Sequence, residues 1–462
     1  MGQITFEVPP DLPPDRRVGL SRAWFAGGYD GSPVPTRRTD APHAFTLRRQ
    51  ETESGYLCVP WRGADGTERV VSSATLRLTD TPYPALRELA RGAVNRVRTM
   101  HFALASAGLK LPNGFADDLA RLTAGFGRVV SGAEPTTAFA VTLVDTATAL
   151  ADRAAAALAE YRLTARHQHH GPLPTRVGSR LSRPLPPDQA ELYLEAFNAV
   201  RVVPDWRAIE PHESATDWTA LDELIGWADH AGLDVTVGPL IDLADGTLPD
   251  WVAAYAGDLP NLAAFVSDYA HTLMSRYRDR VRGWHTFAGF NHADVFGLVE
   301  DDRLRLAARV LETAQELDPK GDRTFAVSQP WGDYLTNEDL TYSPLVFADT
   351  LLRAGLKASA VKLEVIPGAT RRGGERRDAL DLVHLIELFD TLGLPLEAAV
   401  TGPGTDLFLT ALAAPSVRAV YWDTWSAADP CSRVPAFPLV TPDGTPTPTL
   451  TDLRILRQRW LA

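Results

Sequence analysis

One acidic residue in the sequence stands inside a short apolar run, where a charge needs an explanation. Glu364 lies in the run Ala360–Ile366, directly between Leu363 and Val365. Side chains alternate between the two faces of a strand, so Glu364 points away from the face that its neighbours share. If the neighbours face helices, Glu364 faces inward, where burial favours its protonated form and it could act as an acid. The alternative is a structural ion pair with one of the many arginines.

Two carboxylates elsewhere in the sequence are candidates to act together with Glu364. Asp242 follows the apolar run Val235–Leu240, and Asp333 lies in a loop shortly after Trp331. An aromatic ring beside a carboxylate suits sugar binding, because apolar ring faces stack on aromatic side chains while hydroxyl groups need fixed polar partners. For Asp333 the alternative is a cap at the start of a helix.

Other side chains near the ends of predicted strands could bind a ligand. Three tryptophans could form a stacking platform, with packing as the alternative for each: Trp206, Trp331 and Trp422. Five polar residues stand at comparable positions: Asp205, His285, Asn291, Gln329 and Asp423. His285 could equally be a core histidine whose hydrogen bonds are satisfied.

These residues are positioned by short apolar runs that alternate with helical segments from about residue 172 onward. Eight runs have the length and composition of strands: Val177–Leu181, Ala199–Val203, Val235–Leu240, Gly283–Ala288, Thr324–Gln329, Ala360–Ile366, Leu396–Thr401 and Ala419–Asp423. Helical periodicity separates most of them, as in Leu259–Tyr277 and Arg303–Leu317. The pattern predicts a (β/α)8 barrel, in which active sites lie at the carboxyl ends of the strands. A doubly wound open sheet is the alternative, although no Gly-rich phosphate loop follows the first strand.

The N-terminal part of the chain has a different texture. Four strands are predicted before residue 80: Ile4–Val8, Ala44–Arg49, Ser54–Val59 and Val70–Leu78. Three helices follow them: Pro84–Ala107, Phe115–Val130 and Thr137–Arg166. We therefore expect a β-sandwich-like accessory domain over 1–80, a helical bracing region over 81–171 and the barrel over 172–462. The accessory domain has either a structural role or a carbohydrate-binding one.

Composition narrows the classes of partner. The net charge of -12 disfavours nucleic acid and anionic membranes. Two distant cysteines give no disulfide framework, and His167, His169 and His170 have no suitably spaced partners for a metal, so we expect no metal and no cofactor. No signal peptide and no membrane span are predicted, which makes the cytoplasm the default location.

Several barrel segments follow one another in an order that a known family shares. Trp284 stands in the fourth predicted strand, Gly393, Leu394 and Pro395 open the seventh, and Trp422 lies in the eighth. Together they resemble glycoside hydrolase family 10, the xylanase-type barrels, over residues of about 190–462. The family writes its fourth strand Trp-Asp-Val-Val-Asn-Glu and its seventh Gly-Leu-Pro-Val-x-Ile-Thr-Glu. The final Glu of each is catalytic in the family.

This chain departs from the family at both catalytic positions. The proton donor aligns with Gly289 and the nucleophile with Val400. The resemblance implies action on the O-glycosyl bonds of a β-linked oligo- or polysaccharide, a reaction that needs two carboxyl groups. We therefore expect relocated carboxylates, Glu364 with Asp333 or Asp242. The alternative is a barrel without catalytic activity that binds saccharide or serves as an interaction scaffold.

Overall fold

A computed structural model describes residues 2–461 except 135, 245, 293–296, 339, 370–373, 433 and 435. Its residues form two compact units. The N-terminal unit consists of Met1–Thr164, Trp331–Asp339 and Glu375–His384, and the barrel unit consists of Ala165–Pro330, Leu340–Gly374 and Leu385–Ala462. The division between Thr164 and Ala165 falls within one helix, α4 (Thr137–His170).

The barrel unit is built on eight parallel strands that close on themselves, as the sequence predicts. In chain order the strands are β8 (Arg176–Leu181), β9 (Ala199–Val202), β10 (Asp234–Val237), β12 (Gly283–His285), β14 (Asp322–Ser328), β15 (Ala360–Val365), β16 (Leu396–Val400) and β17 (Val417–Trp422). β17 pairs with β8, which completes the ring. The closure excludes the open-sheet alternative and confirms a (β/α)8 barrel. Two short strands, β11 (Ile241–Asp242) and β13 (Phe287–Ala288), pair with each other beyond the ends of β10 and β12.

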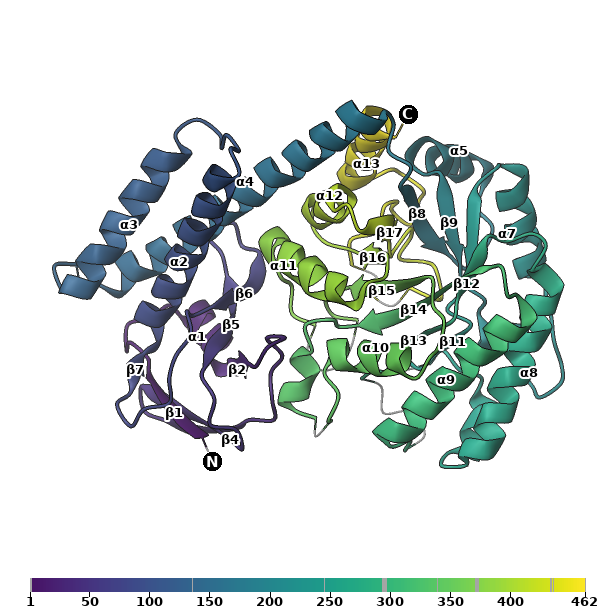
Figure 1. The fold of residues 1–462 in the computed structure, drawn as a ribbon, viewed down its shortest axis with the longest axis horizontal. Coiled ribbons are helices and arrows are strands. Elements are labelled where there is room, and N and C mark those ends of the chain that lie inside the picture. The colour runs from purple at the N-terminus through teal and green to yellow at the C-terminus, as the bar shows by residue number, and fades with distance from the viewer. Residues whose placement is uncertain are drawn as a thin grey trace. The chain divides into compact units, whose positions relative to one another are not determined.

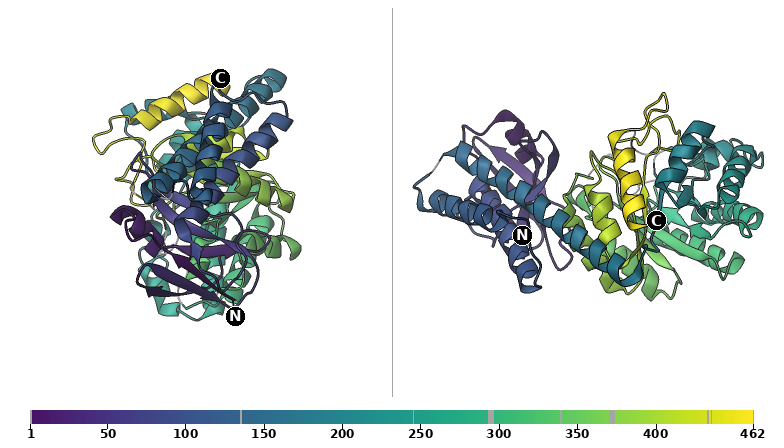
Figure 2. Two further views of the ribbon diagram at one scale, coloured as in Figure 1. Left: turned by 90° about the vertical axis from the view of Figure 1, so that its left-hand side faces the viewer. Right: turned by 90° about the horizontal axis from the view of Figure 1, so that it is seen from above.

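Helices follow the barrel strands and lie outside them (Figure 1). They are α5 (Pro187–Ala196), α6 (Trp206–Ile209), α7 (Thr219–His230), α8 (Leu259–Tyr277), α9 (Glu300–Leu317), α10 (Pro344–Arg353), α11 (Ala379–Phe389), α12 (Asp406–Ala413) and α13 (Pro448–Trp460). Two short 3-10 helices accompany them, η1 (Asp250–Tyr255) and η3 (Asp390–Leu392), and a third, η2 (Asp333–Thr336), belongs to the N-terminal unit. The C-terminal α13, yellow in Figure 2, packs on α5. Among the helices described, none is both long and apolar enough to cross a membrane.

The N-terminal unit contains two small sheets and three long helices. One sheet has the order β3-β4-β1-β7 and the other β2-β5-β6. The strands are β1 (Gly2–Glu7), β2 (Trp24–Gly27), β3 (Arg37–Ala41), β4 (Ala44–Arg49), β5 (Gly55–Arg62), β6 (Glu68–Ser72) and β7 (Tyr83–Pro84). The helices are α1 (Pro14–Ser21), α2 (Ala85–Ser106), α3 (Phe115–Ser131) and most of α4. Both sheets contribute side chains to one apolar core, for example through Phe6 and Phe25. The sandwich-like packing of this region stays a prediction.

Two segments from far along the chain complete this unit. Ala379, Leu380 and Val383 belong to the same apolar core as the two sheets. Arg96 in α2 donates to both carboxylate oxygens of the buried Asp378. The core of the N-terminal unit is therefore assembled from residues that the sequence separates by more than two hundred positions.

Candidate functional site

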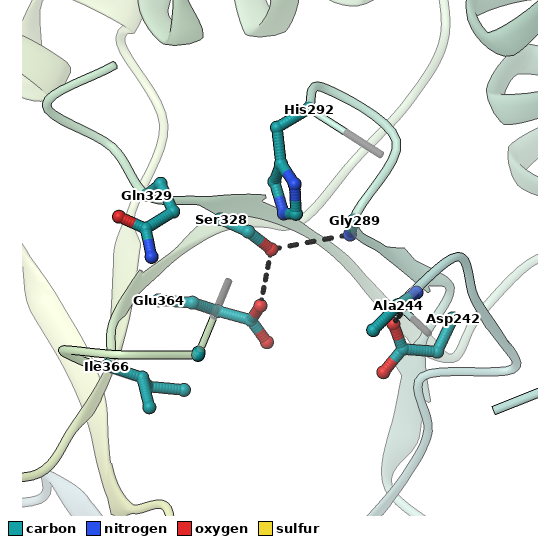
Figure 3. Close-up of a pocket in the computed structure, with 9 residues that line it drawn as sticks. Asp242, Ala244, Gly289, His292, Ser328, Gln329, Glu364 and Ile366 are labelled. Carbon is teal, nitrogen blue, oxygen red and sulfur yellow. Dashed lines mark hydrogen bonds between the residues drawn. The ribbon is translucent and has the colours of Figure 1, made fainter. Parts of the chain in front are cut away.

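A pocket opens at the carboxyl ends of the barrel strands. The space between its walls is about 290 Å3, a volume that includes open solvent. The lining side chains come from five stretches of chain: Asp242 and Ala244, Gly289 and His292, Ser328 and Gln329, Glu364 and Ile366, and Ala369. Glu364 and Asp242 lie on opposite sides, and both carboxylates point into the shared space (Figure 3). Two of the three predicted catalytic carboxylates therefore meet in one pocket.

The buried Glu364 lines the pocket and also forms an ion pair. The Ser328 hydroxyl donates a hydrogen bond of 2.6 Å to Glu364 Oε2. Glu364 Oε1 lies 3.7 Å from Nη1 of Arg201, an arginine with no exposed surface. A hydrogen-bond donor and a cation both favour the ionised carboxylate over the neutral acid. Glu364 thus lines the pocket and is also paired with a buried arginine, while its catalytic role stays a prediction.

The ion pair continues to the other side of the barrel. Nη2 of Arg201 lies 3.8 Å from Oδ1 of Asp423, and Nη1 of Arg180 lies 3.5 Å from the same oxygen. All these side chains are almost fully buried. Two arginines and two carboxylates therefore form a network at the level of the pocket, where a barrel of this type ordinarily has branched aliphatic side chains.

Ser328 is held in place by the chain that follows β13. The Asn291 amide donates to Ser328 O (2.8 Å) and accepts from Ser328 N (3.1 Å), while Gly289 N donates to Ser328 Oγ (3.3 Å). Asn291, predicted as a ligand-binding residue, thus supports the residue that contacts Glu364.

Gly289 occupies a backbone conformation that disfavours a side chain. Its φ is +79°, and a Cβ atom there would stand 3.3 Å from Ala244 N. The side chains before Gly289 do not alternate regularly between the two faces of the strand. Trp284 and Phe287 are three residues apart, yet both reach the helix layer. Trp284 donates to Asp318, and Phe287 packs on Phe347. The position that aligns with the family's proton donor is therefore shaped for glycine.

Val400 faces away from the pocket. Glu397 on the same strand contacts Lys362 of β15 and Arg176 of β8, so its side chain faces the barrel interior. Alternation then places Ala399 on the interior face and Val400 on the helix face. Ala399 pairs in register with Glu364 on the neighbouring strand. The interior carboxylate at this level is therefore on the sixth barrel strand, not the seventh.

A second charged layer lies below the pocket. Lys362 Nζ is 3.5 Å from Glu397 Oε2 and 4.8 Å from the centre of the Tyr421 ring. Burial, assisted by the charge of Arg201, lowers the pKa of Lys362 to about 7. Burial alone would raise the pKa of Glu397, but the positive charges of Lys362, Arg176 and Arg418 outweigh it and lower that pKa.

Asp242 and Gln329 form two sides of the pocket. Asp242 is partly exposed, and its Oδ1 accepts from Ala244 N (3.0 Å). Gln329 has a φ of +52°, which is uncommon for a residue with a side chain and is found most often at functional sites. Its amide rests against Gly374: a Cβ atom on Gly374 would stand 2.2 Å from Gln329 Nε2.

Four of the other residues predicted to bind ligand are engaged inside the barrel unit. Asp205 caps α6 by accepting from Ala208 N, and the buried Trp206 ring stacks on Tyr269 with centroids 4.3 Å apart. The buried Trp422 donates to Phe437 O (3.0 Å), and His285 has no exposed surface. Their part in ligand binding stays a prediction.

Asp333 and Trp331 belong to the N-terminal unit. The Asp333 carboxylate lies 2.7 Å from Nη2 of Arg377, and both side chains are buried. The Arg377 guanidinium also lies 5.6 Å from the Trp331 ring centre and 5.8 Å from that of Trp24. Within this unit Asp333 is thus one half of a buried ion pair.

Sequence reasoning missed Arg201, Ser328 and the lower charged layer. The signal that singled out Glu364 was nevertheless present. Arg201 stands between Val200 and Val202, and Lys362 between Val361 and Leu363. Each is a charge flanked by aliphatic residues within a predicted strand, so alternation places it inward as well. In the part of the chain that the structure describes, no cluster of His, Cys, Asp and Glu is arranged to hold a metal ion.

No protein-family model matches the chain, and no curated protein is similar to it in sequence. Solved structures of xylanases are similar to it in fold. Xylanase 10B from Thermotoga maritima is 14% identical over 65% of this chain and 97% of its own, with a TM-score of 0.46. A GH10 xylanase from Thermobacillus composti is 15% identical over 61% and 96%, with a TM-score of 0.45.

A third structure, xylanase 10C from Cellvibrio japonicus in complex with xylopentaose, is 13% identical over 61% of this chain and 66% of its own, with a TM-score of 0.48. At such identities the likeness concerns the fold alone. The closed ring of eight parallel strands establishes that fold independently. The chain thus contains a closed (β/α)8 barrel.

Proposed function

We propose that this protein is a glycoside hydrolase-like enzyme that cleaves O-glycosyl bonds with an unusual pair of carboxylates. One observation carries the proposal: Glu364 and Asp242, from two different strands, line a single pocket at the mouth of the barrel. Enzymatic hydrolysis of a glycosidic bond commonly uses two carboxyl groups that flank the bond. The ligand we propose is a β-linked oligo- or polysaccharide, a choice that rests on the sequence resemblance to family 10.

The contacts of the two carboxylates support different roles. Glu364 is buried beside Arg201 and accepts from Ser328, which favours a negatively charged group. Asp242 is partly exposed, so it can exchange protons with solvent between turnovers. A pair whose environments differ in this way is typical of sites that need one acid and one base or nucleophile.

A second candidate function is saccharide binding without hydrolysis. Gly289 and Val400 favour it, because neither position that aligns with a family carboxylate holds one. The pocket, its strained Gln329 and the network behind it would then serve recognition alone.

A screen of aryl β-glycosides and β-linked oligosaccharides, followed by two substitutions, tests the proposal. We expect Glu364→Gln and Asp242→Asn each to lower kcat/KM by about a hundredfold or more, the effect of losing acid–base assistance. Asp250→Asn, a change at an exposed barrel carboxylate, is the control and should leave kcat/KM unchanged.

Unchanged hydrolysis by Glu364→Gln would remove the assignment. Binding of an oligosaccharide in calorimetry with no turnover would instead support the second candidate.

A further inference from the structure

Arg201 stands between two carboxylates at the bottom of the pocket. It comes from β9, has no exposed surface, and reaches Glu364 with one terminal nitrogen and Asp423 with the other. The fork of a guanidinium suits this bridging position, since its nitrogens are fixed in one plane.

Counted over the residues that the structure describes, the charges of this network balance only when both carboxylates are ionised. Arg201 and Arg180 carry two positive charges, and Glu364 and Asp423 carry two negative ones. Protonation of Glu364 would leave an excess positive charge in a buried place, which is costly because the desolvated cation loses its partner. The network therefore opposes a neutral Glu364.

Ser328 supplies a hydrogen-bond partner that suits the ionised form of Glu364. Its hydroxyl lies 2.6 Å from Glu364 Oε2, and Gly289 N donates to the hydroxyl oxygen. Asn291 fixes the Ser328 backbone on both sides, which keeps the hydroxyl within reach of the carboxylate. An ionised Glu364 can accept the hydroxyl proton, which would favour that form.

From these contacts we infer that Arg201 is a positioning residue that keeps Glu364 negatively charged in the pocket. Glu364 then works as a proton acceptor, a nucleophile or a stabiliser of positive charge, and a different group donates the proton to the leaving oxygen. This inference rests on the proposed function for its catalytic meaning, but the charge state itself can be measured without a substrate.

Several charged or titratable groups lie near Glu364, and a test must distinguish their effects on its titration from the effect of Arg201. Among the residues that the structure describes, these are Arg201 on β9, Arg180 on β8, Asp423 after β17, Asp242 on β11, His292 after β13 and Lys362 on its own strand. Lys362 is positively charged throughout the pH range in which a glutamate titrates, because its pKa is about 7, so its charge is the same in the wild type and in the Arg201 variants. Arg201 lies 3.7 Å from the Glu364 carboxylate, so its removal should change the titration of Glu364.

Carbon-13 NMR of protein labelled at the glutamate carboxyl carbons tests the inference. Glu364→Gln identifies the Glu364 signal by its loss. We expect the wild-type signal to be in its ionised position at neutral pH. Arg201→Met should raise the Glu364 midpoint by about one pH unit or more. Arg176→Met is the matched control, since this buried arginine pairs with Glu397 in the lower layer, and it should leave the midpoint in place.

A wild-type Glu364 that is protonated at neutral pH would overturn the inference, as would equal shifts in the two arginine variants. If Arg201→Met does not fold, Arg201→Gln removes the same charge with a polar side chain, and the wild-type titration still decides. If Glu364 titrates as expected and no saccharide is hydrolysed, the proposed function fails while the role of Arg201 stands. If a saccharide is hydrolysed but the Glu364 midpoint does not respond to Arg201→Met, the role of Arg201 fails while the proposed function stands.

Discussion

A lysine without exposed surface is the most costly single residue of the barrel interior. Lys362 lies near Glu397, yet Glu397 also receives the charges of Arg176 and Arg418. Burial opposes the ammonium form, which explains a pKa near 7. Near pH 7, Lys362 is therefore present in both its charged and its neutral form inside the folded barrel.

The stability of the protein should rise with pH above 7 because of Lys362. Its pKa is about 7 in the folded protein and roughly 10.4 in an unfolded chain, so between these values the unfolded state binds more protons. The free energy of unfolding then increases with pH by at most roughly 1.4 kcal/mol per pH unit. Urea unfolding between pH 6 and 8.5 measures this slope.

The variant Lys362→Met is the control for this pH dependence, because the methionine side chain fills the space of the lysine methylene groups but carries no titratable group. The difference in unfolding free energy between wild type and variant should shrink or reverse as the pH rises from about 7. Parallel curves for the two proteins would show that Lys362 has an ordinary titration.

Gln329 is the pocket residue whose conformation depends most on a neighbour. Gly374→Ala should push the Gln329 amide out of place, because the new Cβ would stand 2.2 Å from its nitrogen. We expect about a tenfold weaker affinity for the saccharide found in the screen, the loss of roughly one polar contact. Calorimetry measures it.

The control for Gly374→Ala is Gly368→Ala. Gly368 has nearly the same φ, +78° against +80°, but nothing lies within 4 Å of its added Cβ. Both variants share the backbone strain, so equal losses of affinity would mean that the contact with Gln329 is unimportant.

At the residue level, alternation within a strand predicted the inward direction of Glu364 from sequence. It could not name Arg201 as the partner, since the two residues are far apart in sequence and meet only through the closure of the barrel. The positive φ of Gln329 could not be predicted from the sequence either, because a Gln followed by Pro330 does not specify a left-handed conformation.

At the level of elements, strand register decides which side chains reach the pocket. β16 presents Glu397 and Ala399 to the interior and Val400 to the helices. Sequence alignment by the Gly-Leu-Pro run located the seventh strand correctly but did not give the phase of its side chains. Phase depends on the pairing with β15, and a shift of one residue reverses every side chain of a strand.

A carboxylate introduced at Val400 should therefore destabilise the protein without creating activity. Val400→Glu would place a charge between the barrel and its helices, with an expected loss of about 3–5 kcal/mol in the free energy of unfolding. Denaturant unfolding measures the loss, and the glycoside screen checks activity.

Val400→Ala separates lost packing from the buried charge and should cost less than Val400→Glu. A gain of hydrolysis in Val400→Glu would contradict the register and return the nucleophile to the seventh strand.

At the level of the whole molecule, the chain builds its N-terminal unit from three separate segments. Periodicity predicted the barrel and, in this part, the helices α2, α3 and α4 and the strands β1, β4, β5 and β6. It missed α1, β2, β3 and β7. The contribution of Trp331–Asp339 and Glu375–His384 was not, because short loop segments carry no signal of the core they join. The predicted limits at residues 80 and 171 and the accessory role of the N-terminal region stay predictions.

A fragment of residues 1–164 should fail to fold cooperatively. It lacks Ala379, Leu380 and Val383 of its own core, and Arg96 loses its buried partner Asp378. We expect near-native helix content without fixed packing, seen as retained far-ultraviolet and lost near-ultraviolet circular dichroism.

In the full chain, Asp378→Asn is the subtler form of the same test. It should lower the free energy of unfolding by at most about 3 kcal/mol, because Arg96 loses one of its two carboxylate partners and keeps Asp381. A fragment that unfolds in a sharp transition at the temperature of the full protein would contradict both expectations.

The three-segment core also has a consequence for synthesis on the ribosome. Thr164 leaves the exit tunnel long before His384, with more than two hundred residues still to be translated between them. At bacterial and eukaryotic rates of roughly 5–20 residues per second, the first part of the unit waits on the order of ten to forty seconds for its missing pieces. During that interval its apolar faces are uncovered, so we expect the nascent chain to depend on chaperones until the second of the late segments has emerged.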